Sequence, residues 1–321
     1  MRAMAETLER HQTALCLAAL AVGAVVGLVA PGAAGTLGVA VEPVLGLLLY
    51  ATFLGVPFDR IRVALRDGRF LAAILVVDFL VVPAVVFVLS RIVAHDRALL
   101  VGVLFVLLTP CIDYVIAFTG MAGGAKDRLL AAVPLLLIGQ MVVLPLALWI
   151  MVGSDVVAAI EPEPFLRALL LLVVLPLAAA ALTQLAAARS RPGRIVRETA
   201  TTAMVPLMML TLALVVASQI HGIGSHLGAL SLAILVHVLF AVAMVPLGIL
   251  AGRIAHLDVP GRRALVFSGV TRNSLVVLPL ALALPESFAL VPLVIVSQTL
   301  VELVVMVILV RVVPRAVPAH V

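Results

Sequence analysis

Long apolar runs, separated by short polar segments, follow one another along almost the whole chain. A membrane-spanning helix needs about 20 mainly apolar residues, and ten runs approach that length. They predict helices over residues 12–30, 36–57, 70–90, 99–120, 129–152, 165–187, 199–219, 228–251, 264–284 and 289–310. The pattern therefore predicts an all-α membrane protein with ten transmembrane helices.

A short internal repeat relates the two halves of the chain. The segment Pro134–Gln140 (PLLLIGQ) matches Pro292–Gln298 (PLVIVSQ) at an offset of 158 residues. Each half holds five predicted helices, and an odd number places the second copy in the opposite orientation. The repeat therefore predicts two inverted five-helix units, residues 1–160 and 161–321, an arrangement typical of many secondary transporters. The alternative is chance similarity between helices rich in proline, leucine and valine.

The composition strengthens the membrane interpretation. Hydrophobic residues make up 64% and charged residues 12% of the chain, whereas soluble domains average about 45–50% and about 25%. The net charge of +5 does not indicate a nucleic-acid partner, because the basic residues lie in short loops between apolar runs. Seventeen of the 21 arginines and lysines fall on one predicted side of the bilayer. This asymmetry predicts a multi-pass protein of the inner (plasma) membrane with both termini in the cytoplasm.

Polar residues interrupt two of the predicted helices near mid-membrane depth. Thr109–Asp113 (TPCID) interrupts the fourth, where Pro110 removes a backbone donor and favours a break. Thr271–Ser274 (TRNS) interrupts the ninth. The repeat offset pairs these two helices, so we expect both to be discontinuous and to cross at their breaks. Half-helix ends at such a crossing attract ions.

Asp113 and Arg272 are the most informative charges within these interruptions. An arginine in the middle of a membrane helix costs about 2.5–3.5 kcal/mol on insertion scales, so it is expected to have a partner. Two interpretations of this expected ion pair stay open. One is a structural pair that fixes the crossing of the two helices, and the other is a charge pair that substrate or a proton displaces during transport.

Three further polar residues are candidates for coupling transport to an ion gradient. With Arg272 assigned to Asp113, Glu302 has no evident cation, and low dielectric favours the neutral form of a carboxyl group. We therefore expect Glu302 to carry a proton, with a purely structural hydrogen bond as the alternative. Gln140 and Gln298 are related by the repeat and are expected to bond between helices or to supply ligands.

Cys111 lies directly beside the predicted break, next to Pro110. A buried cysteine is commonly a small hydrophobic residue, but a thiolate is also a soft ligand for soft acceptors. No CxxC, HExxH or phosphate-loop motif occurs, so the sequence predicts no metal centre, no cofactor and no ATP-driven pump. It also shows no nucleophile constellation, and an enzyme is not expected. Asp78 and His237 are polar residues within predicted membrane helices, and the sequence indicates no partner for either.

The ten-helix plan, the half-chain repeat and the crossing breaks resemble the bile acid:sodium symporter superfamily. Pro110-Cys111 and Glu302 resemble its arsenite-efflux branch, the arsenical-resistance-3 family, and Asn273-Ser274 is similar to the asparagine-containing crossover of the superfamily. The resemblance implies a core of helices 3–5 and 8–10 and a panel of helices 1, 2, 6 and 7. One departure is that the branch's Pro-Cys-Thr-Ala-Met-Val reads PCIDYV here, and another is the pairing of Asp113 with Arg272.

The resemblance implies efflux of arsenite or antimonite in exchange for protons. Cys111 would contact the arsenic, Glu302 would carry the proton, and Arg272 would restore the charge balance. The expected partners of the cargo hydroxyls are Asp113, Asn273 and Ser274. The alternative is sodium-coupled uptake of an organic anion, with Arg272 pairing the anion. In that alternative the expected sodium ligands are Asn273, Ser274, Gln298 and Glu302.

Overall fold

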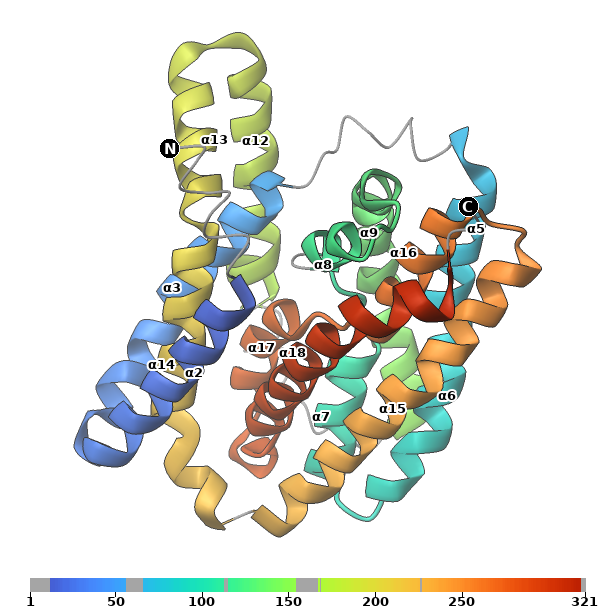
Figure 1. The fold of residues 1–321 in the computed structure, drawn as a ribbon. Helices are drawn as coiled ribbons and strands as arrows, with labels where there is room; N and C mark the ends of the chain where they lie inside the picture. The colour runs from blue at the N-terminus through green and yellow to red at the C-terminus, as the bar shows by residue number, and fades with distance from the viewer. Residues whose placement is uncertain are drawn as a thin grey trace. The chain divides into compact units, whose positions relative to one another are not determined.

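A computed structural model describes residues 12–55, 66–112, 115–153, 167, 169–225 and 227–318 (Figure 1). These residues form fourteen α-helices joined by short 3-10 and π-helical segments. Within the described part of the chain there is no strand, and β-structure is limited to one isolated bridge. The all-helical prediction is therefore confirmed for these residues.

The chain folds into two compact units that alternate along the sequence. One unit comprises Met1–Val56, Glu161–Gly228 and Leu278–Leu284, and the other comprises Pro57–Ile160, Ala229–Val277 and Pro285–Val321. Apart from residues 278–284, the first unit holds predicted helices 1, 2, 6 and 7, and the second holds 3–5 and 8–10. We call the first the panel unit and the second the core unit, because this grouping is the one that the family resemblance implies.

Helices of the panel unit pack closely where small residues face one another. Its helices are α2 (Gln12–Val29), α3 (Ala34–Gly55), α12 (Leu175–Arg189), α13 (Arg191–Thr202) and α14 (Met204–Ser225), with short segments η1 (Pro31–Ala33) and η5 (Leu169–Val174). A Cβ added at Gly23 would lie 2.5 Å from Ala213 O, and one at Gly27 would lie 2.6 Å from Ala217 O. The two glycines therefore allow the backbones of α2 and α14 to approach directly.

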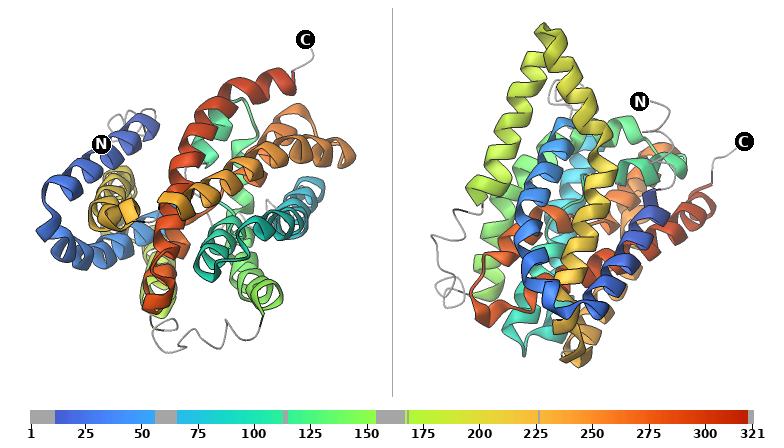
Figure 2. Two further views of the ribbon diagram at one scale, coloured as in Figure 1. Left: turned by 90° about the horizontal axis from the view of Figure 1, so that it is seen from below. Right: turned by 90° about the vertical axis from the view of Figure 1, so that its left-hand side faces the viewer.

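A helical hairpin of α12 and α13 projects from the panel unit (Figure 2). Ser190 ends α12, and its Oγ accepts a hydrogen bond from Gly193 N at 3.2 Å, which caps α13. The apolar pattern predicted the next helix at 199–219 and a loop for the charged stretch before it, and the prediction of a loop is wrong. The serine cap, Pro192 in the first turn and packing against α12 and α3 make this stretch helical.

The core unit holds the remaining helices. They are α5 (Gly68–Val76), α6 (Val82–Ser90), α7 (Arg97–Leu107), α8 (Val115–Met121), α9 (Lys126–Val152), α15 (Leu227–Ile254), α16 (Val259–Val270), the first part of α17 (Ser274–Leu282) and α18 (Val291–Ala316), with short segments η3 (Val77–Val81), η4 (Arg91–Val93) and η6 (Glu286–Phe288). Aspartates begin three of them: Asp67 caps α5, Asp96 caps α7 and Asp258 caps α16. The π-helical segment η3 joins α5 to α6 without ending the span.

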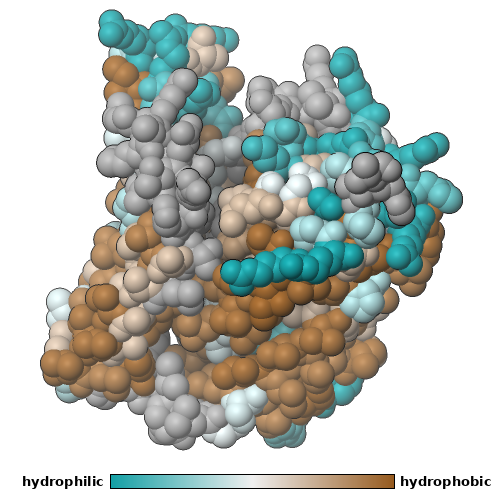
Figure 3. Space-filling view, viewed as in Figure 1, coloured by the Kyte–Doolittle hydropathy of each residue, from teal (hydrophilic) through white to brown (hydrophobic). Residues whose placement is uncertain are grey.

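Several helices are long and apolar enough to cross a membrane. Among the described residues these are Gly68–Val93, Lys126–Val152, Leu230–Ile254 and Glu286–Ala316, and two sharply bent helix pairs also qualify if each pair is one span. Apolar side chains cover much of the visible surface over α15, whereas polar side chains gather near its end and around α5 and α16 (Figure 3). The protein is therefore a multi-pass membrane protein, whereas ten spans and an inverted repeat stay predictions.

Three helices form the buried centre of the core unit. Almost every residue of α7 and of the second half of α16 is buried, and so is the first half of α18. At the contact between α7 and α18, a Cβ added at Gly102 would lie 2.8 Å from Val294 Cβ. Close packing at this point holds the C-terminal end of α7 beside α18, where the candidate site lies.

Candidate functional site

The interruptions of the fourth and ninth predicted helices lie against each other in the core unit. The first separates α7 from α8 and the second separates α16 from α17. Asn273 N donates to Thr109 O at 2.8 Å, and Cys111 N donates to Thr271 O at 3.4 Å. These two bonds flank an isolated antiparallel bridge. The breaks thus satisfy each other's backbone groups, which a helix interruption in lipid would otherwise leave unpaired.

Equivalent threonines end the two interrupted helices in the same way. Thr109 Oγ1 donates to Phe105 O and Thr271 Oγ1 donates to Phe267 O, each at 2.8 Å. Such bonds to the carbonyl four residues earlier compete with the helical ladder and favour a bend or an end. After the second break, Asn273 Oδ1 accepts from Val276 N at 3.1 Å and begins α17.

Arg272 is fully buried, and its two terminal nitrogens are bound by oxygen atoms. Its Nη2 lies 2.7 Å from Asp78 Oδ1 and donates to Ser268 O at 2.5 Å and Gly269 O at 3.0 Å. Its Nη1 donates to Leu107 O at 3.5 Å. The other carboxylate oxygen of Asp78 accepts a hydrogen bond from the Ser268 hydroxyl at 2.7 Å. The charge of the guanidinium is therefore compensated inside the core unit.

The ion pair of Arg272 differs from the one that the sequence led us to expect. Among the described residues its acidic partner is Asp78, to which the sequence analysis assigned no partner. Asp113, the expected partner, lies outside the described residues. Asp78 belongs to the π-helical segment η3, and its side chain has no exposure. Its only sequence signal is that of a carboxylate within an apolar run, which marks it as in need of a partner.

Glu302 contacts the same break through the backbone of Arg272. Its Oε2 accepts a hydrogen bond from Arg272 N at 2.7 Å and another from Gln298 Nε2. Glu302 and Gln298 are both buried on α18. The carboxyl group therefore binds an amide N–H that lies just before the N-terminus of α17, where the helix dipole favours negative charge.

The remaining predicted substrate residues are also buried at the break. Ser274 Oγ accepts from Thr299 Oγ1 at 2.8 Å, which links α17 to α18. Cys111 is 1% exposed and Asn273 is 2% exposed. The Nδ2 atom of Asn273 has no hydrogen-bond partner among the described residues. This amide therefore remains able to donate to a polar cargo.

Among the described residues, no hydrogen bond links Gln140 to this group of contacts. It is buried on α9, and its Oε1 has no hydrogen-bond partner within the described residues. The structure thus joins Cys111, Asn273 and Ser274 through the break and its neighbours, and joins Arg272, Glu302 and Gln298 through direct hydrogen bonds.

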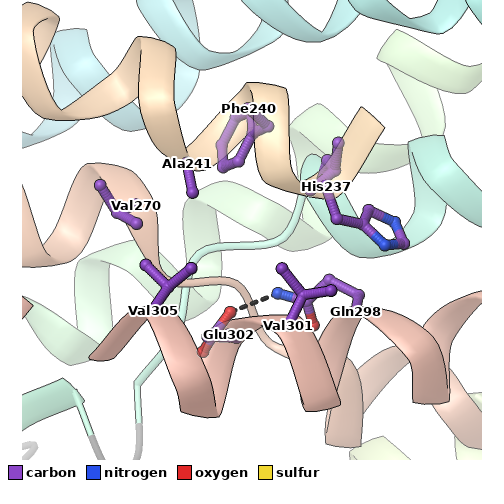
Figure 4. A pocket seen from close by; sticks show the side chains of 9 residues that line it. His237, Phe240, Ala241, Val270, Gln298, Val301, Glu302 and Val305 are labelled. Carbon is purple, nitrogen blue, oxygen red and sulfur yellow. Dashed lines mark hydrogen bonds between the residues drawn. The ribbon is translucent and has the colours of Figure 1, made fainter. Parts of the chain in front are cut away.

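A small pocket of about 10 Å³, room for about one water molecule, lies between α15 and α18 (Figure 4). His237 and Phe240 approach it from α15, and Gln298 and Glu302 approach it from α18. Its complete lining is Leu107, His237, Phe240, Ala241, Val270, Gln298, Val301, Glu302 and Val305. Cys111 and Asn273 are not among these residues. The pocket therefore borders two predicted coupling residues, Gln298 and Glu302, and not the predicted cargo ligands.

His237 is a polar residue of this pocket that the sequence analysis left without a role. It is 2% exposed, and neither ring nitrogen has a hydrogen-bond partner among the described residues. Gln298 Oε1 also has no such partner in the described part of the chain. Together with Glu302, these two residues give a mainly apolar pocket polar atoms that can bind a water molecule.

Buried charges at the meeting point of broken helices, in a multi-pass helical protein, are typical of secondary transporters. The sequence model of the sodium bile acid symporter family matches residues 42–226, which is more than half of the 321-residue chain. The chain therefore belongs to this family and is a membrane transport protein. The matched range includes Asp78, Cys111 and Gln140 and ends before Arg272. A search of curated proteins found no match.

Proposed function

We propose that this protein is a secondary transporter of the plasma membrane that expels arsenite or antimonite in exchange for protons. The observation that carries this proposal is the compensation of Arg272 by Asp78 at crossing helix breaks that also hold the buried Cys111. Arg272 is the only buried arginine or lysine among the described residues. With its charge engaged, the site suits an uncharged cargo better than an anion, and arsenite is an uncharged trihydroxide at neutral pH.

In this proposal Cys111 supplies the first contact with the cargo. Trivalent arsenic is a soft acceptor, and sulfur is the soft ligand of the site. A single sulfur binds weakly and reversibly, which suits a carrier that must release its cargo. The hydroxyl groups of the cargo would be bound by Asn273, whose Nδ2 is buried without a partner among the described residues, and by Ser274. Asp113 keeps this role as a prediction, outside the described residues.

Glu302 would carry the coupling proton. Two neutral donors, a backbone amide and the Gln298 amide, bond to its Oε2. Gain or loss of a proton at Glu302 changes the charge beside the break by one unit. Restoring the charge balance is the proposed role of Arg272, whose partner in the structure is Asp78. Gln298 lies next to Glu302 in the pocket, and Gln140 is proposed as its repeat-related counterpart on α9.

The proposed framework for this cycle is ten helices in two inverted repeats, residues 1–160 and 161–321, with both termini in the cytoplasm. The side-to-side asymmetry of arginine and lysine supports the orientation. The matching threonine contacts of Thr109 and Thr271 support the repeat. Motion of the core unit against the panel unit would expose the site to each side in turn.

Sodium-coupled uptake of an organic anion is the second candidate, and the family match favours it. Arg272 would then bind the anionic group of the cargo. That role requires the guanidinium to leave Asp78 or to bind both groups at once, and the short contact of 2.7 Å between them is the observation against it.

Growth of an arsenite-sensitive host tests the proposal. The wild-type protein should protect the cells, whereas Cys111→Ala and Glu302→Gln should lose most protection at equal expression. The sequence contains two cysteines, and Cys16→Ala is the matched control that should still protect. Full protection by both site variants would refute this mechanism. Sodium-dependent anion uptake that a Cys111→Ser variant retains would establish the second candidate instead.

A further inference from the structure

The oxygen atoms around Arg272 form a ligand set of the kind that binds an alkali cation. Three backbone carbonyls and one carboxylate converge on the guanidinium from three separate segments. We propose that Arg272 acts as a built-in cation that fills a sodium-type position, and that the protein consequently transports without sodium. This inference deepens the proposed function, because it concerns the ion that drives the same site.

The position of these carbonyls explains why a cation is favoured there. Ser268 and Gly269 lie in the last turn of α16, and Leu107 is the last residue of α7. The C-terminal end of a helix carries partial negative charge, and two such ends meet at the guanidinium. In transporters with broken helices, half-helix C-terminal ends and unwound carbonyls coordinate sodium. Here the same kinds of atoms bind Arg272.

A free cation cannot share this position with Arg272. The guanidinium keeps its charge at any physiological pH, and its Nη2 occupies one oxygen of Asp78 at 2.7 Å. The other oxygen of Asp78 is bound by the Ser268 hydroxyl. A sodium ion would have to displace a tethered positive charge from a site with no exposure. Because Arg272 is covalently attached to the chain, its guanidinium occupies this position in preference to an ion from solution.

The backbone of the same residue leads to the proposed proton site. Arg272 N donates to Glu302 Oε2 at 2.7 Å while the side chain points into the oxygen cluster. Glu302 is thus the neighbouring carboxyl group to which the proposed function assigns the coupling proton. The protein would differ in this respect from the sodium coupling that the family name describes.

Thermal unfolding of the purified full-length protein in detergent tests the inference. Wild type, Arg272→Ala and the double variant Asp78→Asn/Arg272→Ala are compared in sodium, potassium and choline chloride at one ionic strength. The wild-type Tm should be the same in the three salts. Arg272→Ala empties the cluster but keeps its oxygens, so sodium should raise its Tm saturably and above potassium. The double variant lacks the carboxylate and should lose most of this rise.

Two results would overturn the inference. One is a saturable, sodium-specific rise in the wild-type Tm, and the other is a folded Arg272→Ala protein whose Tm does not respond to sodium. If Arg272→Ala does not fold, binding of radioactive sodium to the wild-type protein decides, and saturable binding refutes the proposal. A separate assay of arsenite protection distinguishes this inference from the proposed function. Sodium binding together with intact protection refutes only this inference. A wild-type protein that does not respond to sodium and does not protect refutes only the proposed arsenite cargo.

Discussion

The buried ion pair of Arg272 and Asp78 should make a large contribution to the stability of the core unit. Both side chains have 0% exposure and their charged atoms lie 2.7 Å apart. Removal of one partner from such a pair leaves the other charge buried and costs about 3–5 kcal/mol. We expect Arg272→Met to lower the free energy of unfolding by this amount. Asp78→Asn should cost less, because three carbonyl acceptors remain around the guanidinium.

The double variant Asp78→Asn/Arg272→Met separates the pair from its surroundings. Replacement of both charges by neutral side chains of similar size is often nearly neutral, so the loss should be below about 2 kcal/mol. An exposed pair in the same unit provides the control. Arg128 lies 2.7 Å from Asp258, with 41% and 48% of the two side chains exposed. Arg128→Met should therefore cost less than about 1 kcal/mol.

Unfolding by sodium dodecyl sulfate in mixed micelles measures these changes. Trp149 is the single tryptophan of the chain and lies on α9 of the core unit, so its fluorescence follows the unit that contains the pair. The reasoning would be refuted by an Arg272→Met loss no larger than that of Arg128→Met. It would also be refuted if the losses of the two single variants simply added in the double variant.

Three other substitutions, the first with a matched control, have outcomes that the same titration or a thermal scan checks. Gly27→Leu should unfold the panel unit at lower temperature, because a Cβ would lie 2.6 Å from Ala217 O, whereas Gly35→Leu, with nothing within 4 Å, should not. Asp96→Ala removes the cap of α7 and should cost about 1 kcal/mol. His237→Leu should change stability by less than about 1 kcal/mol, because neither ring nitrogen has a partner among the described residues, and a large loss would reveal a bond.

The position of the two helix breaks followed from local chemistry. Pro110 removes a backbone donor, and Thr271–Ser274 places four polar residues within an apolar run. Local signals of this kind act within one or two turns, so a single sequence suffices to find them. To predict that the two breaks contact each other, only the sequence offset between the two halves was needed in addition. The bonds of Asn273 and Cys111 across the breaks follow from that contact.

The partner of Arg272 could not be found in the same way. Asp78 is 194 residues away, and the side chains meet because η3 is π-helical and because α16 packs against it. The sequence does not indicate the π-helical geometry of η3 or its packing against α16, so it does not show where the Asp78 side chain points. Asp113 was chosen because it lies at a break, whereas burial and charge alone do not distinguish between two aspartates in apolar runs. Pairing over such distances depends on how the helices pack.

Transport of arsenite into everted membrane vesicles tests the central claim most directly. With an acidic interior and no sodium in the buffer, vesicles with the wild-type protein should accumulate arsenite, and a protonophore should abolish the accumulation. Cys111→Ala and Glu302→Gln vesicles should show none, while Cys16→Ala vesicles should match wild type. Accumulation that requires sodium, or that persists in the Cys111→Ala vesicles, would contradict the account.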